Sequence, residues 1–325
     1  MAEKILKSLT FSGSEDVYKI LVDYDDIENK ILDRGDGVDS IVRIMYKSGG
    51  TGLDPTPKAT GQYAIALGRY SLASGKNSVA LGYDAKAYGE QSFIANGYNI
   101  AEGRQASAFG NSNSSNGERS FIAGESNTVK AKNGFACGYL NYIDTNATNG
   151  FVINANNKIY SANTFAAGSS NKVKAENGFT CGLSNTVDTN ATNGFAANSV
   201  NTVNAPNAAA FGYNNTASGT SSMAAGSSTL AQGNCSFAGG ISTKALGGAS
   251  FAFGKDVITH DSYAYAGGNN TETEGFSSFA HGSGLRTIKE RQAAFGKYNA
   301  PADNLLFMVG NGTSDTNRKN AFAVD

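Results

Sequence analysis

From about Gly61 to Gly310 the chain repeats one short pattern of apolar and polar positions. Each copy reads apolar, alanine-like, apolar, and then closes on Gly or Asn, as in Ile65-Ala66-Leu67-Gly68. Successive closing residues lie 14 residues apart, except that the steps after Gly138 and Gly182 are 16 residues long. The closing residues are Gly68, Gly82, Asn96, Gly110, Gly124, Gly138, Asn154, Gly168, Gly182, Asn198, Gly212, Gly226, Gly240, Gly254, Gly268, Gly282, Gly296 and Gly310. This regularity indicates a stack of about 18 identical structural units.

The positions of the repeat, numbered from the closing residue as position 0, predict its local structure. Ala occupies position −2 in 13 of the 18 copies, and Phe or Tyr occupies position −3 in 12 of the 18. A unit of 14 residues is too short for a helix pair, but it fits two short strands and two tight turns. Because alternate side chains of a strand face opposite ways, the alanines fill a narrow interior and the aromatic residues face outward. The pattern predicts an all-β parallel solenoid whose turns use Gly and Asn at positive φ.

The aromatic face predicts self-association. Strands that are apolar on both faces must be buried on both faces, and no helical pattern in the repeat region is left to cover this one. An identical chain is the economical partner, and closed cyclic symmetry is the usual arrangement. The residues expected to pack the core or the interface include Phe121, Phe135, Phe165, Phe179, Phe251, Ala252, Phe279 and Ala280.

Position +3 is Asn in nine consecutive copies, from Asn99 to Asn215. Stacked amides bond to one another along cross-β arrays. We therefore expect a structural ladder here rather than a ligand site.

The repeat cadence Ser78-Val79-Ala80-Leu81-Gly82-Tyr83-Asp84-Ala85-Lys86-Ala87-Tyr88-Gly89 resembles the head repeats of trimeric autotransporter adhesins. The resemblance covers roughly Gly61 to Gly296 and implies a left-handed parallel β-roll that forms a homotrimer. A second resemblance lies at the end of the chain. The segments 294–299, 306–312 and 320–325 are similar to the stems of phage tail fibres and tail spikes, where such a stem often precedes a cleaved trimerising chaperone.

Residues 1–50 differ in composition, with 17 charged residues against 36 in the remaining 275. They predict a small α+β attachment domain with a hairpin over 9–22, a helix over Asp25–Leu32 and a strand or short helix over Ser40–Lys47. The alternative is a single coiled-coil helix, because Val17, Ile20, Tyr24, Ile27 and Ile31 follow heptad spacing. A Gly- and Pro-rich linker is expected over 51–60, repeats over 61–310 and the end of the stem over 311–325.

The net charge and the reactive side chains of the sequence limit the classes of function to be considered. A net charge of −1 gives no electrostatic footprint for nucleic acid. No apolar run is long enough to span a membrane, and the N-terminus lacks the pattern of a signal peptide. The two histidines and three cysteines form no catalytic or metal-ligand motif, so no cofactor, metal or catalytic residue is expected. His281 is expected to be packed or at an interface.

These features favour a non-enzymatic structural fibre of a phage, on tail, baseplate or capsid, that attaches to a host surface glycan or protein. Residues 1–50 would join the other virion proteins, and the chain would be made in the cytoplasm of the host bacterium. One alternative is a polysaccharide-degrading spike, whose carboxylates would come from Asp256, Asp261, Glu272, Glu274 and Glu290. Another is a fragment of a bacterial trimeric surface adhesin.

The two 16-residue copies are the candidate receptor site. Both carry Asp-Thr-Asn-Ala-Thr-Asn-Gly, at 144–150 and 188–194, and the two extra residues can only bulge outward. Loops on a rigid scaffold are where recognition usually lies. The candidate contact residues are Tyr139, Tyr142, Asp144, Asn146, Asn149, Tyr160, Asp188, Asn190 and Asn193. The alternative is that these loops brace neighbouring chains.

Overall fold

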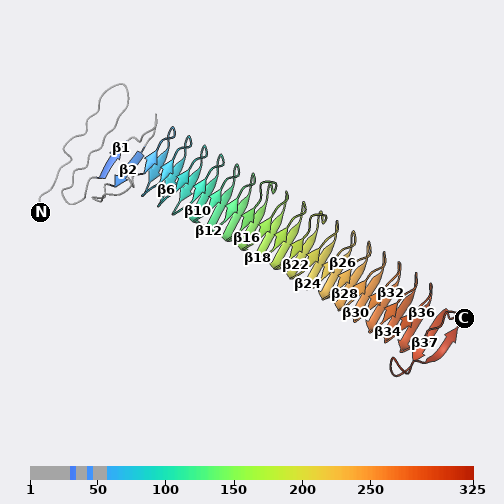
Figure 1. Ribbon diagram of the computed structural model, residues 1–325. Coiled ribbons are helices and arrows are strands. Elements are labelled where there is room, and N and C mark those ends of the chain that lie inside the picture. The colour runs from blue at the N-terminus through green and yellow to red at the C-terminus, as the bar shows by residue number, and fades with distance from the viewer. Residues whose placement is uncertain (1–29, 34–41, 47–56) are drawn as a thin grey trace, which may run out of the picture. The chain divides into compact units, whose positions relative to one another are not determined.

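The computed structural model describes residues 30–33, 42–46 and 57–325, and every regular element in these ranges is a β-strand. The chain forms a parallel β-solenoid of about 18 turns with a repeat of about 14 residues, which confirms the predicted fold class. It divides into two compact units, residues 1–160 (unit 1) and 161–325 (unit 2). Each coil contributes one long strand and one short strand, and like strands of consecutive coils lie side by side within each unit (Figure 1).

In unit 1 the long strands pair in parallel with a register step of one repeat, so Phe121 lies opposite Phe135 and Gly124 opposite Gly138. The long strands are β4 (Ile65–Leu67), β6 (Val79–Leu81), β8 (Phe93–Ala95), β10 (Ser107–Asn111), β12 (Phe121–Glu125), β14 (Phe135–Tyr139) and β16 (Phe151–Ala155). The short strands are β3 (Lys58–Ala59), β5 (Leu72–Ala73), β7 (Lys86–Ala87), β9 (Ile100–Ala101), β11 (Ser114–Ser115), β13 (Thr128–Val129), β15 (Tyr142–Ile143) and β17 (Lys158–Ile159).

Unit 2 repeats this arrangement in the same register, with Phe165 opposite Phe179. Its long strands are β18 (Phe165–Ser169), β20 (Phe179–Leu183), β22 (Phe195–Ser199), β24 (Ala209–Tyr213), β26 (Met223–Ser227), β28 (Phe237–Ile241), β30 (Phe251–Lys255), β32 (Tyr265–Asn269), β34 (Phe279–Ser283), β36 (Ala293–Lys297) and β37 (Phe307–Asn311). Its short strands are β19 (Lys172–Val173), β21 (Thr186–Val187), β23 (Thr202–Val203), β25 (Thr216–Ala217), β27 (Leu230–Ala231), β29 (Lys244–Ala245), β31 (Ile258–Thr259), β33 (Glu272–Thr273) and β35 (Arg286–Thr287).

The start of the chain departs from the prediction. The helix expected over Asp25–Leu32 is wrong at its end, because β1 (Lys30–Asp33) is a strand that pairs antiparallel with β2 (Val42–Tyr46). The second expected element, a strand or short helix over 40–47, is a strand, and it joins the sheet by pairing in parallel with β4. The backbone pairing of this hairpin overrides a weak helical pattern. The hairpin over 9–22 and the rest of the coiled-coil alternative lie outside the described residues. The stacking begins at β3, inside the range expected to be a linker.

In the last coil the side chain of Asn299 makes the hydrogen bonds that a short strand makes in the other coils. β37 continues the parallel register, but no short strand forms between it and β36 in the described chain. Asn299 takes over the role of that strand, because its side chain accepts from the backbone N–H of Arg286 and donates to the carbonyl of Arg286, both at 2.8 Å. Strand β38 (Asn320–Val324) then runs antiparallel to β37. The end of the stem is thus a hairpin that caps the parallel stack.

The coil interior holds small side chains, as the pattern predicts. The side chains at position −2, including Ala252 and Ala280, are fully buried, and so are those at position +5 from Ala73 to Thr287. In six consecutive copies position +5 is Val or Ile. In four of these six copies the residue four positions before the next closing residue is Gly. A Cβ on Gly178 would lie 2.5 Å from Val173 Cγ1, and a Cβ on Gly134 would lie 2.4 Å from Val129 Cγ1. Branched side chains and glycines therefore share a fixed volume.

The turns confirm the predicted positive φ at position 0, with Gly110 at 102° and Asn96 at 76°. Two further positions, +2 and −5, are also left-handed in nearly every copy, and the sequence pattern did not indicate them. They are filled by residues as unlike as Leu140 (φ 55°), Val200 (φ 59°) and Arg119 (φ 56°). Closure of the coil, and not the preference of each residue, sets the backbone at these positions.

The expected asparagine ladder at position +3 forms within each unit. The two N–H groups of the Asn113 side chain are shared among three acceptors, Asn99 Oδ1 (3.1 Å), the Phe109 carbonyl of its own coil (2.9 Å) and the Gly124 carbonyl of the next coil (2.7 Å). The backbone N–H of Asn113 also donates to Asn99 Oδ1 at 2.9 Å. These amides are buried and satisfied by their neighbours, so they are structural. We call them the buried asparagine row.

Candidate functional site

The extra residues of the long coils form a tight turn that follows a short strand. In unit 1 the N–H of Ala147 donates to the Asp144 carbonyl at 3.0 Å, and the N–H of Gly150 donates to the Ala147 carbonyl at 2.9 Å. The hydrogen bond from Gly150 to Ala147 is also present at the equivalent position of many of the ordinary 14-residue coils. The two inserted residues therefore add only the turn closed by the hydrogen bond from Ala147 to Asp144. Thr145 and Asn146 stand exposed at its tip, while Ala147 is buried. The expected outward bulge is therefore compact and well fixed.

Unit 2 repeats this turn over Asp188–Gly194. The N–H of Ala191 donates to the Asp188 carbonyl at 2.9 Å, and the N–H of Gly194 donates to the Ala191 carbonyl at 2.8 Å. Thr189 and Asn190 are the exposed pair. The internal duplication seen in the sequence is thus also a duplication of local structure.

The charged residues beside the two turns are paired within the chain. Lys174 Nζ donates to Asp188 Oδ1 at 2.8 Å, and this hydrogen bond, helped by the backbone N–H of Thr189, holds the pKa of Asp188 below its usual range. In unit 1 Tyr142 Oη donates to Asp144 Oδ2 at 2.8 Å, and Lys130 Nζ lies 5.4 Å from the centre of the Tyr142 ring. Burial raises the pKa of Tyr142, and the hydrogen bond to Asp144 raises it further. These groups hold their turns in place.

A second row of asparagines runs along the surface beside the turns. Six consecutive copies have an exposed Asn at position −5, namely Asn133, Asn149, Asn163, Asn177, Asn193 and Asn207. In unit 1 Asn133 Nδ2 donates to Asn149 Oδ1 at 2.9 Å. In unit 2 Asn177 Nδ2 donates to Asn193 Oδ1 at 3.0 Å, and Asn193 Nδ2 donates to Asn207 Oδ1 at 2.9 Å. We call this the exposed asparagine row.

Most of the expected contact residues therefore lie on one edge, that of the turns which lead into the long strands. In unit 1 this edge carries Tyr142, Asp144, Asn146, Asn149 and Tyr160, and the rings of Tyr142 and Tyr160 are 5.9 Å apart. In unit 2 it carries Asp188, Asn190 and Asn193. The exposed row itself was missed beyond Asn149 and Asn193. Its sequence signal was present, as Asn recurring five residues before each closing residue.

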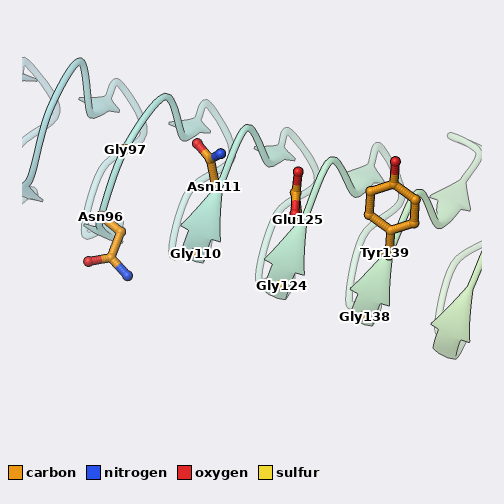
Figure 2. Close-up of a pocket in the computed structure, with 8 residues that line it drawn as sticks. All are labelled: Asn96, Gly97, Gly110, Asn111, Gly124, Glu125, Gly138 and Tyr139. Atoms are coloured by element: carbon orange, nitrogen blue, oxygen red, sulfur yellow. The ribbon is translucent and has the colours of Figure 1, made fainter.

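Tyr139 belongs to a different surface. It lies at position +1, at the end of β14, and lines a shallow groove with Asn96, Gly97, Gly110, Asn111, Gly124, Glu125 and Gly138. Figure 2 shows Asn111, Glu125 and Tyr139 projecting side by side from three consecutive coils. The groove is open, with glycine backbone at its floor, and it does not include the inserted turns.

The first coils expose a tyrosine cluster that the pattern analysis did not single out. The rings of Tyr70 and Tyr83 meet edge to face with their centres 5.6 Å apart, and Tyr83 and Tyr98 follow at 5.2 Å. The Arg69 guanidinium lies 4.9 Å from the centre of the Tyr70 ring. The signal in the sequence was Tyr at positions +1 and +2, where most other copies have smaller or polar residues.

The aromatic face is only half-buried in a single chain. Phe135 and Phe151 stack with ring centres 4.6 Å apart, as do Phe165 and Phe179. The stacking is interrupted at Ala209 and Met223 and resumes from Phe237 through Phe251 and Tyr265 to Phe279. Phe121 keeps 37% and Phe251 keeps 38% of its surface exposed. His281 is exposed on this face, with Nδ1 3.4 Å from Tyr265 Oη, so its expected packing is not made within the chain.

The side chains considered for chemistry have structural contacts. Glu272 Oε1 lies 2.8 Å from His260 Nε2, and Glu272 Oε2 lies 3.6 Å from Arg286 Nε. Cys137 and Cys181 are half-buried and Cys235 is exposed; all three are free thiols. In the described part of the chain no three His, Cys, Asp or Glu side chains gather closely enough to hold a metal ion. A search of the same residues for a helix suited to crossing a membrane finds none.

Comparison with known proteins agrees with the fold. The family model of the YadA head domain repeat matches residues 73–93, 101–121 and 204–229, so segments of both units are similar to that head repeat. No curated protein matches the chain. The head-repeat similarity and the β-solenoid together indicate an adhesin-like structural protein with trimeric-autotransporter-type repeats.

Proposed function

We propose that this chain is a non-enzymatic adhesive fibre protein that works as a homotrimer. The observation that carries the proposal is the row of stacked aromatic rings on one sheet face, which a single chain leaves only half-buried. Burying an aromatic side chain contributes up to several kcal/mol at about 25 cal/mol per Å². Repeated over many coils, this favours burial against identical chains, and the head-repeat similarity supports three of them.

Oligomeric state tests the assembly. Sedimentation of the full chain should give three chains per particle. Phe251→Lys together with Phe279→Lys places charge on the aromatic face of unit 2 and should yield smaller particles or unfolded chain. A stable monomer that keeps its β-rich circular dichroism without such changes is the outcome that defeats the proposal.

The fibre is further proposed to belong to a phage virion, with residues 1–50 joined to other virion proteins and the repeats meeting a glycan or protein of the host surface. Support comes from the similarity of the C-terminal segment to phage fibre stems and from the distinct composition of the first 50 residues. The second candidate is a surface adhesin of a bacterium, and the match to the YadA head domain repeat favours it. Immunogold labelling separates the two, because one predicts label on phage particles and the other on bacterial cells.

The adhesive role is tested with particles coated with the full chain. These should adhere to host cells above the level of particles coated with an unrelated trimer. A polysaccharide-degrading spike is tested in the same material, since the average chain length of the host polysaccharide should stay constant under a non-enzymatic fibre. A steady fall in chain length, together with release of oligosaccharide, would replace the fibre with a depolymerase.

A further inference from the structure

The exposed asparagine row is not explained by its backbone. All of its members sit at left-handed φ, which Asn tolerates better than most residues. The same position is equally left-handed elsewhere, yet it holds Ser221 (φ 57°), Cys235 (φ 55°) and Ala249 (φ 51°) in the three coils that follow the row. The N-terminal coils use Gln91 and Gln105 there. The backbone accepts many side chains, so another property accounts for Asn in six consecutive coils.

The row keeps hydrogen-bonding capacity that faces solvent. Asn193 uses one N–H toward Asn207 and one lone pair toward Asn177. An amide has two N–H donors and two acceptor sites, so Asn193 retains one of each. In the buried asparagine row the corresponding N–H of Asn185 donates to a backbone carbonyl, and the corresponding lone pair accepts from the backbone N–H of Asn201. Asn193 is thus an oriented amide, fixed by its neighbours and still able to donate and to accept.

We infer that the exposed asparagine row Asn177–Asn193–Asn207 of unit 2, with the tip of the inserted turn at Thr189 and Asn190, binds a neutral saccharide chain. This rests on the proposed adhesive function and names its ligand class. A hydroxyl both donates and accepts, so neighbouring hydroxyls of a sugar ring complement an amide that offers one donor and one acceptor. In unit 1 the equivalent Asn133 side chain donates to Asn149 Oδ1 near the other inserted turn.

Spacing favours a sugar chain over a peptide. Consecutive coils are separated by about 4.8 Å, the strand spacing of a sheet, and the amides repeat at that step. An extended peptide advances only about 3.3 Å per residue and falls out of register with the row. One hexose unit of an extended β-1,4-linked chain has nearly the length of the step between coils. Such a chain can lie along the row and place hydroxyls on each amide in turn.

Charge favours a neutral saccharide over an acidic one. Lys174 and Asp188 neutralise each other at 2.8 Å. Glu176, the exposed residue before Asn177, adds a carboxylate beside the row. An acidic polysaccharide would therefore lie close to net negative charge. Electrostatic repulsion between like charges is screened least at such short range.

The test uses the full chain and a panel of hexasaccharides, measured by surface plasmon resonance. Cellohexaose and mannohexaose represent extended neutral chains, maltohexaose a curved neutral chain, and hexagalacturonate an acidic one. At least one extended neutral hexasaccharide should bind. The triple variant Asn177→Gly, Asn193→Gly, Asn207→Gly should weaken that binding at least about tenfold, because it removes the hydrogen bonds that three consecutive amides make to the sugar. Glycine fits the left-handed backbone, so the fold should remain.

A matched variant controls for backbone flexibility. Ser221→Gly, Cys235→Gly and Ala249→Gly change the same position in the next three coils of the unit and should leave binding unchanged. Equal loss from both triple variants, binding of hexagalacturonate alone, or binding of none of the neutral hexasaccharides would overturn the inference. So would a peptide library that binds through the three asparagines while no sugar does. If sugars fail but particles coated with the chain still adhere to cells, the adhesive function stands and only the ligand class falls.

Discussion

The buried and the exposed asparagine rows use one residue type for two purposes. In both, amides bond from coil to coil at about 3 Å. A buried amide such as that of Asn185 also bonds to two backbone carbonyls and receives a neighbour's backbone N–H. The exposed amide of Asn193 bonds to the side chains of Asn177 and Asn207. The difference shows that the environment, not the residue, decides whether a ladder stabilises the fold or offers groups to a ligand.

The largest expected effect comes from the buried row. Asn185→Leu keeps the shape but removes the side-chain hydrogen bonds that Asn185 makes to the backbone N–H of Asn201 and to the carbonyls of Cys181 and Asn198. Each buried polar group left unpaired costs about 1–3 kcal/mol, so we expect a loss of roughly 3 kcal/mol or more in the free energy of unfolding. Urea denaturation with hydrogen exchange on the neighbouring coils measures it.

Asn193→Gly in the same coil is the matched control for this prediction. It removes an exposed amide at φ 59°, a conformation that glycine adopts freely, and should change stability by less than about 0.5 kcal/mol. Equal losses from the two variants would contradict the contrast between the rows.

The second prediction concerns the interior beneath the exposed row. The six coils that present exposed Asn also have Val or Ile at position +5. Gly178 follows Asn177 directly, and Gly178→Ser would place Cβ 2.5 Å from Val173 Cγ1, which should cost about 1–3 kcal/mol by overpacking. Adding Val173→Ala recreates the Ala and Ser pair of other coils and should restore most of the loss. A double-mutant cycle on thermal unfolding measures this coupling, and additive losses would show that the two positions do not share volume.

Periodicity made the repeat predictable because each copy reports the same environment independently. Alanine at position −2 in most copies predicted a narrow coil interior. Nine consecutive asparagines at position +3 predicted the buried asparagine row. Each of these predictions rested on many copies of one local rule.

Features that depend on coil closure could not be predicted in the same way. Val200 gives no sign that its φ is 59°, since the ring of the coil imposes that angle. The strand at Lys30–Asp33 is set by pairing with Val42–Tyr46, and Asn299 replaces a strand through one side chain. The exposed row was visible in the sequence, but only burial distinguishes it from the buried one.

The third prediction uses that imposed angle. Val200 is the residue before the buried Asn201, and a β-branched side chain in the left-handed region is strained. Val200→Asn should therefore stabilise the chain by about 1 kcal/mol, seen as a higher melting temperature. The reciprocal change, Asn214→Val at the equivalent position with φ 55°, should lower it by a similar amount. If both variants have the same melting temperature as the parent chain, local strain at this turn contributes nothing to the register of the buried row.

The smallest expected effect is a difference between the two rows in how their contribution to the stability of the folded chain depends on pH. The buried row contains no titratable group, whereas the inserted turn beside the exposed row is fixed by Lys174 and Asp188. The pKa of Asp188 is lower in the folded chain than in the unfolded one, because Lys174 and the N–H of Thr189 stabilise its charged form. The resulting stability is present above the unfolded pKa of about 3.9 and is lost as the pH falls through the folded value.

Because both side chains are partly exposed, this contribution should be below about 1 kcal/mol and should shrink in salt. Asp188→Asn should therefore destabilise the chain slightly at pH 7 and not at all near pH 2, while the deficit of Asn185→Leu should be the same at both pH values. The comparison is made on melting curves of the two variants and the parent at each pH. A deficit of Asp188→Asn that persists at low pH would show that the loss does not come from the charge of Asp188.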